Sequence, residues 1–134
     1  MSGKWLSFLV GISGLLLLTN CQDNTFKQGE ILYLNKCASC HMANGEGLQS
    51  LIPPLAGFNY LAENRAQIAC IITNGLADTI KYGNRVFVEP MEGIPNLTEA
   101  EITNIINYIN HAWGNDFGYV KINDVKEALI DCKE

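Results

Sequence analysis

The chain has 134 residues, enough for one ordinary domain and too few for two. Hydrophobic residues make up 48% of it, so a packed core is feasible, and acidic residues outnumber basic ones to give a formal net charge of −5. This acidic balance argues against a nucleic-acid partner, which would require a basic face.

The first twenty residues differ in character from the rest of the chain. Lys4 is their only charged residue, and a mostly apolar run follows from Trp5 to Leu18. This run is shorter than the roughly 20 residues that span a membrane, and its length is typical of the hydrophobic region of a secretory signal peptide. We expect residues 1–20 to be such a signal; an uncleaved N-terminal anchor is the alternative.

The end of this run resembles a bacterial lipobox. The sequence LLTNC, residues 17–21, ends in a cysteine, although Asn20 stands where such motifs usually have a small residue. The resemblance implies cleavage before Cys21, lipidation of Cys21 and anchoring to a membrane surface on the periplasmic side. Residues 21–24 would then form a short tether, and residues 25–134 the folded domain.

The first helix of the folded domain is predicted to begin near Thr25. Thr25 and Gln28 fit a capping box, and the helix runs on into Cys37. Gly29 and Tyr33 are four residues apart and so share one face. A glycine inside a helix costs about 1 kcal/mol relative to alanine, which indicates that another helix approaches closely at this position.

Two long irregular segments flank the second predicted helix. Residues 42–60 are rich in glycine, proline and asparagine, and a loop of this length is unusual unless it wraps around something. The second helix is predicted over residues 61–74, with Gly75 as its stop. The second irregular segment, residues 76–96, contains Met91.

The third helix carries the clearest pattern, because Thr98 and Glu101 form a capping box ahead of an apolar face. That face, at helical spacing, consists of Ile102, Ile105, Ile106, Ile109 and Trp113. A short last helix is predicted to begin at Asn123 or Asp124 and to turn Cys132 inward. Strand-like alternation is absent, so we expect an all-α fold. Its helices and long loops share little interior, which indicates that a large apolar group fills the middle.

The pentapeptide CASCH, from Cys37 to His41, is the most specific motif in the chain. A thioredoxin-type redox pair would need a surrounding βαβ pattern, and a zinc site would need two further ligands at a recognisable spacing. The C-x-x-C-H pattern instead attaches haem c, with one thioether from each thiol and the histidine beneath the iron. We therefore predict one covalent haem held by Cys37, Cys40 and His41.

A haem in this position needs a second axial ligand on its opposite face. Met42 is too close to His41 to reach around the ring, whereas Met91 lies in a loop much later in the chain. We predict Met91 as the ligand, with His111, expected to be solvent-exposed, as its rival. Methionine raises the reduction potential relative to histidine. It also occupies the position where oxygen would bind, which favours electron transfer over catalysis.

The two remaining cysteines form an even pair in a chain that we expect to be exported. Such pairs favour a disulfide in oxidising compartments. We predict a bond between Cys70 and Cys132 that ties the terminal helix to the second helix. Two buried free thiols are the alternative.

The ordered set of motifs from Thr25 to Asn115 resembles the class I c-type cytochromes, which are small single-haem electron carriers. Four pieces carry the resemblance: G-x-x-x-[FY]-x-x-x-C-x-x-C-H ending at His41, P-x-L-x-G beginning at Pro53, the methionine loop PMEGIPNLT, and the last helix EITNIINYINHAWGN. The resemblance implies a cytochrome c fold, with three main helices and a short C-terminal helix around one haem c.

The same resemblance implies roles for two single residues. Gly29 would lie where the first and third helices cross, facing Ile105 and Tyr108. Pro53 would offer its carbonyl to the Nδ1–H of His41, which fixes the imidazole and strengthens it as a donor.

We therefore expect a single-electron carrier and not an enzyme. Its partners would be redox proteins of a bacterial respiratory chain, such as an oxidase, a reductase or a quinol-oxidising complex. A haem peroxidase or gas sensor with an open iron site remains an alternative, as does a thiol-redox lipoprotein without haem. Docking would use an apolar patch around Ala38, Met42 and Ile52, or a basic partner.

Overall fold

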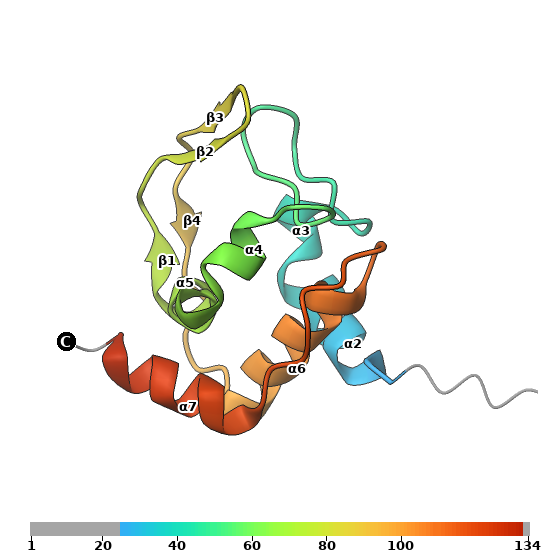
Figure 1. Cartoon of the computed structure of the whole chain (residues 1–134), viewed down its shortest axis with the longest axis vertical. Helices are drawn as coiled ribbons and strands as arrows, with labels where there is room; N and C mark the ends of the chain where they lie inside the picture. Colours follow the sequence, from blue (N-terminus) through green and yellow to red (C-terminus); the bar gives the residue numbers. More distant parts are fainter. Residues whose placement is uncertain (1–24, 133–134) are drawn as a thin grey trace, which may run out of the picture.

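The computed structural model describes residues 25–132, which form several helices and two pairs of very short strands (Figure 1). The helical elements are α2 (Lys27–Lys36), α3 (Ala38–His41), α4 (Tyr60–Glu63), the 3-10 turn η2 (Arg65–Gln67), α5 (Ile68–Asn74), α6 (Glu99–His111) and α7 (Ile122–Asp131). The predicted helical fold is confirmed. The predicted signal, the lipidation site Cys21 and the tether lie outside the described residues.

The crossing of α2 and α6 organises the molecule (Figure 1). Gly29 is buried at this crossing, where an added Cβ would lie 2.1 Å from the carbonyl oxygen of Asn104 and 2.7 Å from the Cβ of Tyr108. The predicted close approach is therefore present. Tyr108 faces Gly29 as expected, but the second residue nearest to Gly29 is Asn104 and not Ile105. The crossing fixes the direction in which α2 delivers the chain to α3.

Helix α6 is the central element of the core. Its capping box is present: the Thr98 hydroxyl accepts from the Glu101 N–H at 3.3 Å, and the Glu101 carboxylate accepts from the Thr98 N–H at 2.8 Å. All four isoleucines of the predicted face are buried. Trp113 lies beyond the end of the helix, where its ring packs against Tyr33 with centroids 5.0 Å apart.

The start of α2 differs from the prediction. The helix begins at Lys27 with Phe26 as its N-cap and no side-chain capping bond, so the predicted capping box of Thr25 and Gln28 is wrong. The Phe26 ring stacks on His111 with centroids 4.5 Å apart. This stacking leaves His111 half-buried and not solvent-exposed as expected, and its Nδ1 donates to the Asn107 carbonyl at 2.8 Å.

The second predicted helix is divided into α4, η2 and α5. The interruption lies at Asn64, whose Nδ2 donates to the carbonyl oxygen of Tyr60 at 2.9 Å. Asparagine side chains that bond the backbone in this way compete with helix continuation. Directly after the break, the Arg65 guanidinium donates to the Phe117 carbonyl and so joins this segment to the chain that follows α6.

Two antiparallel strand pairs occupy the second irregular segment. Strand β1 (Gly75–Leu76) pairs with β4 (Met91–Glu92), and β2 (Ile80–Tyr82) pairs with β3 (Arg85–Phe87). Strands of two or three residues are too short to produce a recognisable alternation, which is why an all-helical reading overlooked them.

The chain after α6 returns across the core as a tail that ends in α7. The Asn107 side chain bonds both the N–H and the carbonyl of Val120, at 2.8 and 2.9 Å. Val125 of α7 is buried. A disulfide joins Cys70 of α5 to Cys132, with the Cα atoms 5.6 Å apart. Within residues 25–132, no helix has the length and apolar character needed to cross a membrane.

Candidate functional site

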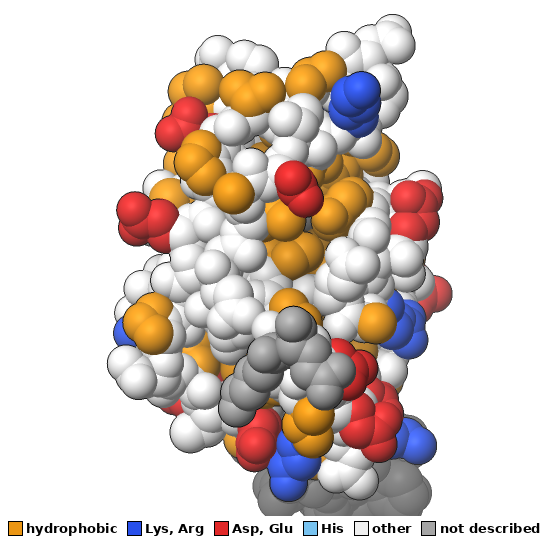
Figure 2. Space-filling model, turned by 90° about the vertical axis from the view of Figure 1, so that its left-hand side faces the viewer, with side chains coloured by type: hydrophobic (Ala, Val, Ile, Leu, Met, Phe, Trp, Pro, Cys, Tyr) orange, Lys and Arg blue, Asp and Glu red, His pale blue; other side chains and the backbone are white. Residues whose placement is uncertain are grey.

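A cavity of about 560 Å³ opens between α3, α5 and β4. The face turned toward the viewer in Figure 2 carries a hollow where hydrophobic side chains gather. Its apolar lining includes Leu55, Leu61, Ile72, Leu76, Phe87 and Ile105. This cavity is the space that the two long loops enclose, and its volume lies within the range of ligand sites, roughly 300–1,000 Å³.

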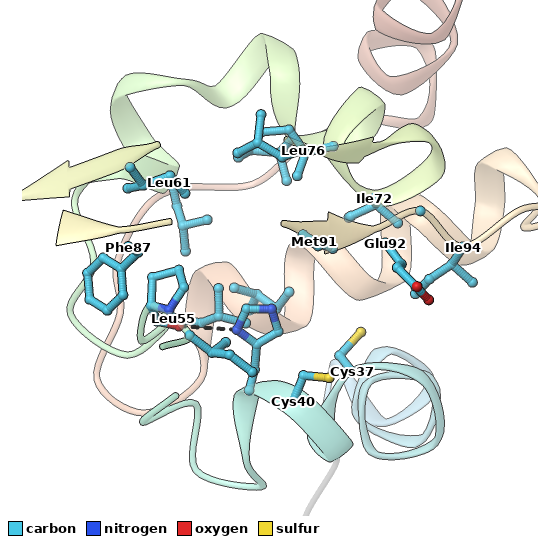
Figure 3. Close-up of a pocket in the computed structure, with 18 of the residues that line it drawn as sticks. Cys37, Cys40, Leu55, Leu61, Ile72, Leu76, Phe87, Met91, Glu92 and Ile94 are labelled. Carbon is cyan, nitrogen blue, oxygen red and sulfur yellow. Dashed lines mark hydrogen bonds between the residues drawn. The ribbon is translucent and has the colours of Figure 1, made fainter. Parts of the chain in front are cut away.

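Cys37 and Cys40 lie together at one edge of the cavity (Figure 3). Cys37 links α2 to α3, and Cys40 lies within α3, where its N–H donates to the carbonyl of Cys37 at 3.1 Å. Both thiols are free. Burial, followed by the neighbouring Cys40, raises the pKa of Cys37 to about 11. Reactive C-x-x-C pairs typically have a lowered thiol pKa, which is the opposite of the shift at Cys37.

His41 ends α3 and is buried, with 8% of its surface exposed. Its Nδ1 lies 3.2 Å from the Pro53 carbonyl oxygen, the bond drawn as a dashed line in Figure 3. A carbonyl can only accept, so Nδ1 carries the proton and Nε2 has the free lone pair. Burial lowers the pKa of His41, although the bond to Pro53 opposes the shift. The neutral ring suits a metal ligand.

The chain around His41 is held by backbone bonds. The Gly47 N–H donates to the His41 carbonyl at 3.1 Å. The hydroxyl of Tyr33 donates to the carbonyl of Met42 at 2.6 Å, and burial raises the pKa of this phenol, so it remains a donor. These bonds fix the backbone of both His41 and Met42. Met42 does not line the cavity.

Met91 enters the cavity from β4, across from the two cysteines (Figure 3). Strand β4 is pressed against the end of α5 through two glycines. A Cβ at Gly75 would lie 2.4 Å from the Met91 carbonyl oxygen, and a Cβ at Gly93 would lie 2.4 Å from that of Thr73. The Ile94 N–H donates to the Ile72 carbonyl at 2.8 Å. These contacts fix the backbone that carries Met91.

Four charged residues also line the cavity and are exposed to solvent: Lys36, Asp78, Glu89 and Glu92. Three of them are acidic, so the rim of the cavity is negative on balance. In the described part of the chain, no group of three His, Cys, Asp or Glu side chains could hold a metal ion.

The residues at this cavity fit a haem. Two free thiols lie side by side at one edge, a neutral imidazole has its Nε2 available, a thioether enters from another element, and the remaining walls are apolar. Covalent haem attachment requires two thiols at this spacing followed by an axial histidine. The predicted residues Cys37, Cys40, His41, Pro53 and Met91 are thus brought to one site.

Some residues that shape the site were not found from the sequence. The sequence marks Gly75 only as a helix stop and Gly93 only as part of the methionine loop, yet both let β4 approach α5. In the sequence Asn115 is only the last residue of a motif, yet its side chain is buried and donates to the Leu55 carbonyl. The available signal for Asn115 is a polar residue directly after a glycine, Gly114, just beyond the third helix.

Comparison with known proteins agrees with this geometry. The family model for cytochrome c matches residues 26–113, which is more than half of the chain. The chain is similar to the cytochrome c subunit of a quinone alcohol dehydrogenase from Gluconobacter oxydans, at 31% identity over 93% of the chain and 26% of that protein.

Two further relatives each match about two thirds of the chain or slightly less. Cytochrome c-552 from Thermus thermophilus is 31% identical over 60% of the chain and 64% of that protein. The cytochrome c subunit of a gluconate 2-dehydrogenase from Pantoea cypripedii is 26% identical over 65% of the chain and 20% of that protein. The chain therefore spans less than two thirds of the length of each of these relatives.

Proposed function

Because this chain belongs to the cytochrome c family and carries haem c, we propose that it is a single-electron carrier with His/Met ligation. Cys37 and Cys40 would hold the haem through thioethers, and His41 and Met91 would ligate its iron. The observation that carries the proposal is the cavity itself, with the cysteines and Met91 on facing sides (Figure 3). Bound haem c supplies a reversible one-electron change at iron without breaking a bond.

Three features of the chain would adapt the haem to electron transfer. Pro53 holds the His41 ring through Nδ1, which directs Nε2 into the cavity. Methionine as the second ligand favours the reduced state relative to a second histidine. The apolar walls, among them Leu55 and Ile105, exclude water and so limit solvent reorganisation when the charge changes. An electron carrier needs this arrangement, whereas an enzyme needs an open coordination position.

Carbon monoxide distinguishes the three classes of function. The protein is made in a host that attaches haem, reduced and exposed to carbon monoxide. A carrier with both axial positions filled keeps its reduced visible spectrum. A peroxidase or gas sensor with an open iron site shows a large spectral change. A thiol-redox protein is colourless and has free thiols at Cys37 and Cys40.

The partner is a redox protein whose basic side chains meet the acidic rim of this chain's cavity. Named relatives are cytochrome subunits of a quinone alcohol dehydrogenase and a gluconate 2-dehydrogenase, which supports exchange with dehydrogenases or quinol-oxidising complexes. Asp78, Glu89 and Glu92 outnumber Lys36 at the rim. Opposite charges would steer such a partner, an effect that raises association rates by roughly 10- to 1,000-fold.

Ionic strength tests this docking mode. Electron transfer to a basic redox partner should slow strongly as salt rises, because salt screens charges beyond about 10 Å at 0.1 M. Glu89→Gln and Glu92→Gln should reduce the salt dependence. Glu127→Gln on α7 is the matched control, because Glu127 is exposed but does not line the cavity. A rate that is independent of salt would favour apolar docking around Ala38.

The place of action is the periplasmic side of a membrane, with lipid on Cys21 as the anchor. The LLTNC sequence and the apolar run before it support this proposal. Mass spectrometry of the N-terminal peptide tests this proposal, which predicts a diacylated Cys21 as the first residue of the mature protein. A chain that keeps residues 1–20 would favour an uncleaved N-terminal anchor.

A further inference from the structure

Asn115 is a buried polar residue to which the proposed function gives no role. It follows the end of α6, is 7% exposed, and uses its side chain in three hydrogen bonds. Its Oδ1 accepts from the Gly57 N–H at 2.7 Å. Its Nδ2 donates to the carbonyl oxygens of Leu55 at 3.0 Å and Ile109 at 2.8 Å. One amide therefore joins the end of α6 to the long loop before α4.

The same loop carries the hydrogen-bond partner of the imidazole. Pro53 lies two residues before Leu55, and its carbonyl accepts from His41 Nδ1 at 3.2 Å. Within the loop, the N–H groups of Leu55 and Ala56 both donate to the Gly45 carbonyl, at 2.7 and 2.9 Å. These bonds hold the two arms of the loop together. They do not attach the loop to α6, whereas the Asn115 side chain does.

We propose that Asn115 is a positioning residue for the axial histidine. It holds the loop so that the Pro53 carbonyl meets the Nδ1–H of His41, and in this way it sets the reduction potential of the haem. The inference rests on the proposed role of His41 as a ligand. A partner at Nδ1 orients a ligating imidazole and raises its basicity. A more basic ligand stabilises ferric iron. Loss of Asn115 should weaken the bond between the Pro53 carbonyl and His41 Nδ1, make the imidazole less basic, and so raise the midpoint potential of the haem.

The test compares Asn115→Ala and Asn115→Leu with Asn107→Ala in the full haem-bearing chain. Asn107 is the matched control, because it is also a buried asparagine and bonds the backbone of Val120 on the α7 side. The readouts are the midpoint potential and the exchange rate of the His41 Nδ1 proton by NMR.

We expect both Asn115 variants to speed this proton exchange and to shift the redox equilibrium toward the reduced state. Mutation of a group that bonds a metal ligand typically costs about 10- to 100-fold in metal affinity or activity. Asn115 acts one step further out, so we expect at most a tenfold shift of the redox equilibrium, which corresponds to about 59 mV for one electron. Asn107→Ala should lose stability and leave both readouts unchanged.

Two results overturn the inference: Asn115 variants that keep both wild-type values, or Asn107→Ala shifting both readouts equally, which marks a general loss of stability. If neither Asn115 variant accumulates, native-state exchange of the wild type decides. The inference then requires that the Gly57 amide proton and the His41 Nδ1 proton exchange through openings of the same free energy. Unequal opening free energies refute it. Failure of the proposed function is distinguishable, because His41→Ala would then keep the wild-type visible spectrum.

Discussion

Replacement of Gly29 by alanine tests the helix crossing that positions the haem-attachment segment. Helix α2 leads directly into Cys37, and α6 lines the cavity through Ile105 and Ile109. A Cβ at position 29 would lie 2.1 Å from the Asn104 carbonyl oxygen, whereas ordinary contact begins at 3.4 Å. The neighbouring atom is helix backbone and cannot rotate away, so the two helices must separate.

The expected magnitude is the difference between two opposing effects. Alanine is favoured over glycine in a helix by about 1 kcal/mol. Overpacking of a buried contact costs typically about 1–3 kcal/mol, and the backbone clash at Gly29 places it at the upper end. We therefore expect Gly29→Ala to lower the free energy of unfolding by about 2 kcal/mol, the difference of the two terms.

Urea unfolding of the haem-bearing protein, followed by circular dichroism, measures this loss. The transition midpoint should fall while its slope stays constant, which identifies a change in stability. Asn35→Ala is the control on the exposed side of the same helix, and it should change stability by no more than about 0.5 kcal/mol. If Gly29→Ala is as stable as wild type or more so, helix propensity dominates and the close crossing is refuted.

Three further predictions concern the tail and the α6 cap. Replacing both Cys70 and Cys132 by serine removes a cross-link over a sequence separation of 62 residues, so urea unfolding should show a loss of about 4 kcal/mol on the chain-entropy model; wild-type stability would contradict this. Thr98→Ala removes the bonds of the hydroxyl to the Glu101 N–H and carboxylate, while the bond from the Thr98 backbone N–H remains. It should cost about 1 kcal/mol in thermal unfolding, and an unchanged melting temperature would show that the hydroxyl contributes nothing. Hydrogen bonds from the Thr98 N–H and hydroxyl lower the pKa of Glu101 below its ordinary value of 4.5. The resulting stability is present above that value and is lost as the pH falls through the lower folded pKa. Glu101→Gln should therefore flatten the stability curve in this acidic window, and a slope equal to that of wild type would exclude the effect.

The sequence patterns that succeeded are those set by local chemistry. The capping box and isoleucine face of α6 depend only on residues within one helix, so the sequence predicts them well. The haem motif is equally local, because Cys37, Cys40 and His41 lie on one turn. Met91 was predicted from its place in chain order and lines the same cavity.

Elements set by tertiary contacts were predicted less well. The capping pattern at Thr25 is not used, and α2 starts two residues later, where Phe26 packs on the ring of His111. The break at Asn64 follows from one side-chain bond to Tyr60, which residue spacing does not reveal. The β1–β4 pair joins the two ends of the second irregular segment, as in the pairing of Leu76 with Met91. The role of Asn115 depends on a loop some sixty residues away.

The sixth ligand is tested most directly by the absorption of oxidised Met91→Ala in the far red, where the iron–methionine bond gives a charge-transfer band. We predict that wild type and the control Met42→Ala show this band, and that Met91→Ala loses it together with a fall in midpoint potential. If Met91→Ala keeps both the band and the wild-type potential, Met91 is not the ligand and the electron-carrier proposal fails.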